Sequence, residues 1–181
     1  MERVFIGLGS NVGARAALID QALLRLNRKP GCSLVQVSSL FETEPVGPPQ
    51  AKYLNAAAEI ETRLEPIAFL GELLDIERQL GRTRSPDERN APRTIDLDLL
   101  MFGARIHLNN GANSQLEIPH PRLTDRPFVL IPLVELDPTL RHPATGDLLA
   151  SFLPVDREND GVVMWRARSS PLDCAEILDQ P

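Results

Sequence analysis

Hydrophobic and polar positions alternate with two different periods along the first part of the chain. Residues 3–10 (RVFIGLGS) form a short apolar run that ends in glycine and serine, which predicts a buried strand. Residues 14–27 carry apolar side chains at helical spacing and are followed by Pro-Gly, which predicts an amphipathic helix. Residues 32–43 return to strict alternation and predict a strand, and residues 53–62 predict another.

A second helix and a further strand complete the pattern. Residues 65–81 have strong helical spacing, with Pro66 in the first turn and Gly81 after the last periodic residue. A polar loop follows, and residues 93–100 (RTIDLDLL) then predict a strand. The order βαββαβ predicts an α+β fold, a ferredoxin-like sandwich in which helices cover one face of an antiparallel sheet.

The pattern is weaker after this sixth element. Residues 118–136 predict a loop that becomes a short helix near Phe128, and residues 161–168 predict one strand. Residues 169–181 predict a C-terminal tail. We therefore expect one domain over residues 1–168, consisting of the sandwich and a C-terminal extension, followed by the tail.

Composition narrows the possible partners and compartment. The chain has 181 residues and a net charge of −6, which argues against non-specific nucleic-acid binding. No apolar run is long enough to span a membrane, and the N-terminus lacks a signal-peptide pattern. Cys32 and Cys174 lie far apart in the sequence, which predicts neither a disulfide framework nor a metal site. We expect a soluble, cytoplasmic protein that binds neither nucleic acid nor a membrane.

The strand at 93–100 contains two aspartates, a residue type that strands disfavour. Side chains alternate across a strand, so Asp96 and Asp98 share one face with Cα atoms roughly 6.5–7 Å apart, while Leu97 and Leu99 face the helices. Like charges this close destabilise a fold unless a cation lies between them. Because Mg²⁺ binds one or two carboxylates together with substrate phosphates, the pair is a candidate metal site. Two solvated surface aspartates are the alternative.

An arginine-rich loop directly precedes this strand. It contains Arg82, Arg84, Arg89 and Arg93. Phosphoryl transfer depends mostly on positioning and charge neutralisation by metals and cationic side chains, so the loop and the aspartates together fit a nucleoside triphosphate. A loop that is merely solvated and pairs with its own acidic residues is the alternative. The stretch GLGSNVG departs from the dinucleotide fingerprint at Val12, and no Walker A motif is present, so an ATP site here would lack a P-loop.

The segment PRTIDLDLLMFG (92–103) resembles the signature of the 6-hydroxymethyl-7,8-dihydropterin pyrophosphokinases, enzymes of folate biosynthesis. Further segments resemble the same family in the same order: residues 5–13, 38–62, 76–84 and 118–138. The resemblance covers about residues 3 to 140. It implies transfer of pyrophosphate from ATP to the hydroxymethyl group of the dihydropterin, giving AMP and the pterin diphosphate in tetrahydrofolate biosynthesis.

The resemblance also implies roles for individual residues. The catalytic residues would be Arg82, Arg93, Asp96 and Asp98, with the two aspartates holding two Mg²⁺ ions. The nucleotide would contact Glu77, Arg84, Arg93, Leu99, His120 and Arg126. The pterin would contact Thr43, Val46, Tyr53, Asn55 and Phe128. Two stacked aromatics and one amide suit a flat heterocycle with mixed donors and acceptors.

Two other functions stay open at the level of sequence. One is another Mg²⁺-dependent, ATP-using transferase on the same sandwich, which would release ADP instead of AMP. The other is a non-catalytic ligand-binding module, since the fold alone does not decide function. A binding module has little use for an aspartate pair and an arginine loop on adjoining elements. We expect ATP and the dihydropterin as ligands, and a monomer.

Overall fold

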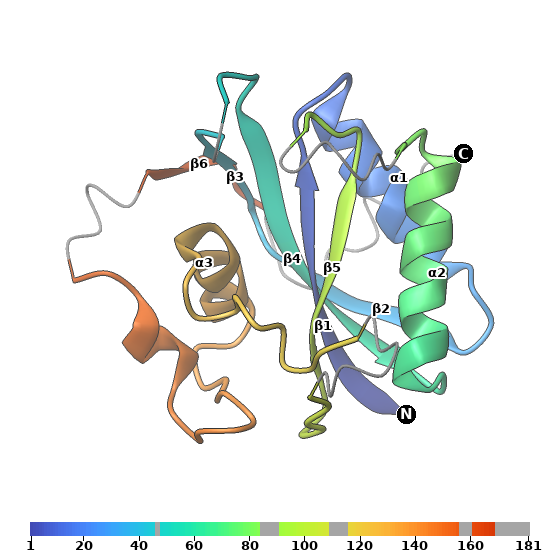
Figure 1. The fold of residues 1–181 in the computed structure, drawn as a ribbon, viewed down its shortest axis with the longest axis vertical. Helices are drawn as coiled ribbons and strands as arrows, with labels where there is room; N and C mark the ends of the chain where they lie inside the picture. Colours follow the sequence, from blue (N-terminus) through green and yellow to red (C-terminus); the bar gives the residue numbers. More distant parts are fainter. Residues whose placement is uncertain (46–47, 84–90, 109–115, 156–160, 169–181) are drawn as a thin grey trace.

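The computed structural model describes residues 1–181 apart from 46–47, 84–90, 109–115, 156–160 and 169–181. The described residues form one antiparallel sheet with three α-helices (Figure 1). The strands are β1 (Glu2–Ser10), β2 (Cys32–Val37), β3 (Leu40–Thr43), β4 (Tyr53–Thr62), β5 (Asp96–Phe102) and β6 (Val162–Arg166). The helices are α1 (Arg15–Asn27), α2 (Pro66–Gln79) and α3 (Pro127–Leu136), and a 3-10 helix, η1, covers Leu149–Phe152.

The strand order confirms the predicted α+β sandwich. The sheet runs β5-β1-β4-β3-β6, with β2 also paired to β4, and every pairing is antiparallel. β1 and β4, which are distant in sequence, lie side by side at the centre, and both are buried along almost their whole length. β6, from the C-terminal extension, pairs with β3 at the sheet edge.

The strand predicted at 32–43 is divided into β2 and β3 by two serines. Ser38 still bonds to β4, through its amide to the Ala57 carbonyl at 2.9 Å. Ser39 instead donates its amide and its hydroxyl to the Glu135 carboxylate of α3, at 2.8 and 2.6 Å. A contact with a distant helix thus replaces the ladder bond, which local alternation could not predict.

The prediction that helices cover one face of the sheet is incomplete. α1 and α2 do share one face, where Leu23, Phe69 and Leu73 pack against apolar strand residues. α3 lies on the opposite face and packs on a second core that includes Phe5 and Met101 (Figure 1). β1, β4 and β5 are apolar on both sides over this part of the sheet, so both faces require cover.

The second face stays open where β1 and β5 carry glycines and aspartates. Gly7 pairs with Asp98, and Gly9 pairs with Asp96. A side chain at Gly9 would come within 3.5 Å of the Asn55 Oδ1 atom, so glycine keeps the surface of the sheet low here. Within the described part of the chain, no helix is long and apolar enough to cross a membrane.

Candidate active site

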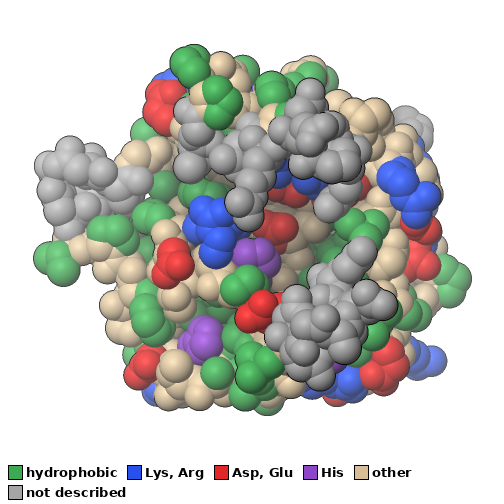
Figure 2. Space-filling model, in the orientation of Figure 1, with side chains coloured by type: hydrophobic (Ala, Val, Ile, Leu, Met, Phe, Trp, Pro, Cys, Tyr) green, Lys and Arg blue, Asp and Glu red, His purple; other side chains and the backbone are tan. Residues whose placement is uncertain are grey.

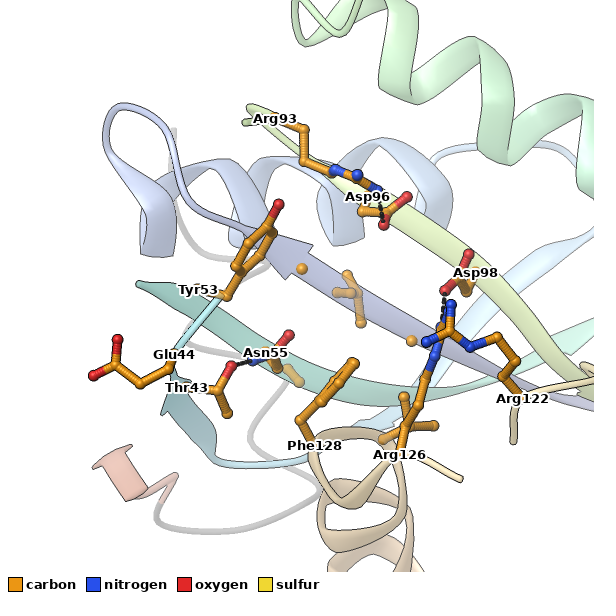
Figure 3. A pocket seen from close by; sticks show the side chains of 15 residues that line it. Thr43, Glu44, Tyr53, Asn55, Arg93, Asp96, Asp98, Arg122, Arg126 and Phe128 are labelled. Carbon is orange, nitrogen blue, oxygen red and sulfur yellow. Dashed lines mark hydrogen bonds and ion pairs between the residues drawn. The ribbon is translucent and has the colours of Figure 1, made fainter. Parts of the chain in front are cut away.

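A pocket opens on the second face of the sheet, between the uncovered ends of β1, β4 and β5 and the start of α3 (Figure 3). It encloses about 820 Å³ of empty space, including solvent at its mouth. The polar and aromatic residues that line it include Thr43, Glu44, Tyr53, Asn55, Arg93, Asp96, Asp98, Arg122, Arg126 and Phe128. Basic, acidic and histidine side chains gather at the centre of this face in Figure 2. A pocket of this size, with an apolar wall and convergent polar groups, is typical of a small-molecule site.

Asp96 is held by two arginines. Arg82 donates from Nη1 to one carboxylate oxygen, and Arg93 donates from Nη1 to the other at 2.7 Å. Burial opposes the charged form, but the two guanidinium groups outweigh burial and lower the pKa of Asp96. Asp96 is therefore ionised at neutral pH.

Asp98 lies two residues further along the strand, on the same face, and its pKa is shifted in the opposite direction from that of Asp96. Burial raises its pKa, and the charge of Asp96 raises it further. Arg126 compensates only in part, with Nη1 at 3.3 Å from the Asp98 Oδ2 atom. The predicted shared face is confirmed, and the nearby cationic groups do not offset the effects of burial and of Asp96 on the pKa of Asp98.

Arg82 also connects the strand to α2. The guanidinium that contacts Asp96 bonds to the Glu77 carboxylate, which in addition accepts the Leu97 amide at 2.8 Å. Glu77 is only 1% exposed. Glu77 therefore orients Arg82 from the buried side, through a contact with its guanidinium. Arg84, which the sequence also predicts at the nucleotide, lies outside the described residues.

His120 is placed next to Asp98 by backbone bonds. Its amide donates to the Leu100 carbonyl at 2.8 Å, and its Nδ1 accepts the Arg122 amide at 3.0 Å. Burial lowers the pKa of His120, with Asp98 opposing the shift. At neutral pH the ring is therefore neutral, with its proton on Nε2.

The residues predicted to bind the pterin line the other end of the pocket. The Asn55 Nδ2 atom donates to Thr43 Oγ1 at 2.8 Å, which fixes the orientation of a buried amide. Tyr53 on β4 and Phe128 on α3 both lie beside this amide (Figure 3). Val46 lies outside the described residues.

The pocket and the predicted residue set differ in a few places. Leu99 is 4% exposed, packs in the core under α1 and α2, and is absent from the pocket lining. Any nucleotide contact of Leu99 would therefore involve its backbone. Sequence reasoning missed Arg122 and Glu44, which line the pocket. Arg122 stands two residues after His120 in the same proline-punctuated loop, and this proximity was the available signal.

Asp96 and Asp98 supply two carboxylates from one strand, β5. Among the described residues, no group of three or more His, Cys, Asp or Glu side chains could hold a metal ion. A site for Mg²⁺ would therefore depend on two carboxylates and on oxygens of a bound ligand, which is the arrangement Mg²⁺ commonly adopts with phosphates.

Comparisons with known proteins show the family of this chain. Residues 5–138 match the model of the 7,8-dihydro-6-hydroxymethylpterin-pyrophosphokinase family. This chain belongs to that family. A relative from Bacillus subtilis, named 2-amino-4-hydroxy-6-hydroxymethyldihydropteridine pyrophosphokinase, is 39% identical over 91% of each chain. A relative of the same name from Pseudomonas aeruginosa is 40% identical over 79% of this chain and 85% of its own.

Solved structures support the fold. Plasmodium falciparum HPPK-DHPS with pterin and p-hydroxybenzoate superimposes with a TM-score of 0.63 at 16% identity, over 83% of this chain. This chain spans 43% of the length of that protein. Pyrophosphoryl transfer in folate biosynthesis is the activity of the family, and the chain is accordingly a pyrophosphokinase.

Proposed function

We propose that this protein transfers the pyrophosphoryl group of ATP to 6-hydroxymethyl-7,8-dihydropterin at the pocket between β5 and α3, with Asp96 and Asp98 holding Mg²⁺. One observation carries the assignment of the site. Two carboxylates with opposite pKa shifts face three arginines, and an aromatic pocket with a fixed amide adjoins them on the same sheet. Perturbed carboxylates in a cleft are typical of functional sites.

The acidic end of the pocket suits Mg²⁺ and the triphosphate. The pKa of Asp98 is raised by burial and by its neighbour, so a cation between the carboxylates would relieve a repulsion already present. When bound, Mg²⁺ supplies positive charge that neutralises phosphate oxygens. Arg82, Arg93 and Arg126, which now contact the carboxylates, would then contact phosphate oxygens.

The proposed reaction forms one P–O bond and breaks another, and it involves no oxidation or reduction. The hydroxymethyl oxygen forms a bond to the β-phosphorus of ATP, and the bond from that phosphorus to the oxygen bridging the α-phosphorus breaks. AMP leaves with the bridging oxygen, and the hydroxyl proton passes to solvent. The protein contributes position and charge, which account for most of the acceleration in phosphoryl transfer.

The pterin end of the pocket suits a flat heterocycle. Asn55 offers both a donor and an acceptor, and its contact with Thr43 holds it in one orientation. Tyr53 and Phe128 provide aromatic surface for the ring. We also propose that residues 1–168 form the catalytic unit, since β6 extends the sheet at β3, the strand that carries Thr43.

Product analysis tests the proposal. AMP should form only when ATP, Mg²⁺ and the hydroxymethyl-dihydropterin are all present, in a 1:1 ratio with the pterin diphosphate. ADP with a phosphorylated acceptor would identify the alternative transferase. Ligand binding without any turnover would identify a binding module.

A substitution at Asn55 separates the two ends of the pocket. Asn55→Ala should weaken pterin binding by about 1–3 kcal/mol, because pterin polar groups lose their partner, and should leave ATP affinity almost unchanged. Calorimetric titration of each ligand measures both effects. Phe128→Ala should act in the same direction by removing aromatic surface. Equal losses for the two ligands would point to general unfolding and contradict the assignment.

A further inference from the structure

One buried amide connects the two loops that lead into the two ends of the pocket. Asn11 follows β1 directly and is only 3% exposed. The side-chain Oδ1 of Asn11 accepts the backbone amide of Arg93 at 2.8 Å, and the backbone amide of Asn11 donates to the Arg93 carbonyl at 3.2 Å. Its Nδ2 donates to Gln50 Oε1 at 2.8 Å and to the Ala51 carbonyl at 3.1 Å. The Oδ1 atom of Asn11 thus bonds to the loop that contains Arg93, and its Nδ2 atom bonds to the loop that contains Gln50 and Ala51.

Each loop carries a residue of the proposed site. Arg93 extends from the first loop to Asp96 and would contact phosphate. Ala51 lies two residues before Tyr53, which opens β4 and provides aromatic surface for the pterin. The ends of the pocket also touch directly. Burial raises the pKa of Tyr53, while the charge of Arg93 and a hydrogen bond with it act against that rise.

We propose that Asn11 is a positioning residue that couples nucleotide binding to pterin binding. The inference rests on the proposed function. A phosphate that holds Arg93 also fixes the Arg93 backbone, which fixes Asn11, and Asn11 in turn fixes the segment from Gln50 to Ala51. The cost of ordering this chain of contacts falls on the first ligand, and the second ligand binds more tightly for that reason. Asn11 is not among the residues that line the pocket.

Coupling between the two ligands is measured as a ratio of dissociation constants, so a coupling role of Asn11 can be distinguished from a purely structural one. A hydrogen bond that only stabilises the fold changes the melting temperature and leaves the ratio alone. The ratio is the Kd of the dihydropterin without nucleotide divided by its Kd with saturating Mg²⁺ and a non-hydrolysable ATP analogue carrying an α,β-methylene group. By linkage, the analogue must show the same ratio in the presence and absence of the pterin, which gives an internal check.

The test is calorimetric titration of wild type and Asn11→Ala. We expect a ratio of about tenfold or more in wild type and within about twofold of one in Asn11→Ala. The affinity for the pterin alone should change less than the ratio does. Asn11→Asp is the second variant: it keeps the acceptor for the Arg93 amide and loses both donors to Gln50 and Ala51. Its ratio should also fall, although the contact with Arg93 persists.

Asn27→Ala is the matched control. The Asn27 side chain also connects two segments, since its Oδ1 accepts the Leu34 amide at 2.8 Å, but it lies among α1 and β2 residues away from the pocket. This variant should lose stability and keep the wild-type ratio. A wild-type ratio in Asn11→Ala and Asn11→Asp, or a ratio of one in wild type, overturns the inference. Absence of binding of both ligands to wild type would instead refute the proposed function.

Discussion

Replacing Asp98 with asparagine is expected to abolish most turnover and to raise the melting temperature of the metal-free protein. Turnover should fall by at least about 10²–10³-fold, because one of the two carboxylates available to Mg²⁺ is lost. Stability should rise because burial and the charge of Asp96 both disfavour the Asp98 carboxylate. Asparagine has almost the same shape, so no cavity forms.

Asp96→Asn should have the opposite effect on stability with the same effect on turnover. Arg82 and Arg93 stabilise the charge of Asp96 enough to lower its pKa against burial. Removing that charge leaves both guanidinium groups with a weaker partner, and the melting temperature should fall. The two variants therefore lose activity alike and diverge in stability, a pattern that general damage to the fold would not produce.

The stability gain of Asp98→Asn should depend on pH. A raised pKa means that the folded protein binds the proton more tightly than the unfolded chain does. The charge penalty in wild type is therefore complete above the raised pKa and absent below the ordinary aspartate value of about 4. Melting curves of both proteins in EDTA should differ at neutral pH and converge in acid. A constant difference across this range would contradict the assigned cause.

Local patterns predicted the parts of the molecule that local rules control. The strand at 53–62 has its predicted limits, and the shared face of Asp96 and Asp98 follows from simple alternation. The split at Ser39 was not predictable, because it depends on Glu135, which lies 96 positions away. The place of α3 on the second face depends likewise on how the strands are ordered.

Candidate site residues divide in the same way. Residues with a chemical signature, such as the aspartates and Arg93, stand out in the sequence. Asn11 carries no such signature, and the only sequence signal for Arg122 was its proximity to His120. Their roles arise from what the fold brings beside them: a pocket wall in one case, two loops in the other. The segment from 84 to 90, which includes two of the four predicted loop arginines, lies outside the described residues.

Arg82→Ala is expected to reduce both turnover and stability, for two separable reasons. Arg82 contacts Asp96 in the site and Glu77 in the interior. Loss of Arg82 should lower kcat by about 10³-fold or more, because we propose that its guanidinium contacts phosphate. Loss of the cation next to a carboxylate that is 1% exposed should destabilise the fold by up to about 3–5 kcal/mol, because the buried Glu77 carboxylate loses its contact with the Arg82 guanidinium.

The double variant Arg82→Ala/Glu77→Gln separates these two effects. Neutral glutamine can still accept the Leu97 amide, the bond that Glu77 makes at 2.8 Å, so most of the lost stability should return. Turnover should stay at the level of Arg82→Ala, because the Arg82 guanidinium, which is proposed to contact phosphate, is still absent. Urea unfolding measures the first quantity, and AMP formation at saturating substrates measures the second. Recovery of kcat together with stability would mean that Arg82 acts only by holding Glu77 and Asp96 in place. Arg82→Lys completes the series: one atom, Nη1 of Arg82, contacts both carboxylates, and an ammonium group could replace that atom but not the planar fork proposed to contact phosphate, so the variant should restore part of the stability and little of the rate.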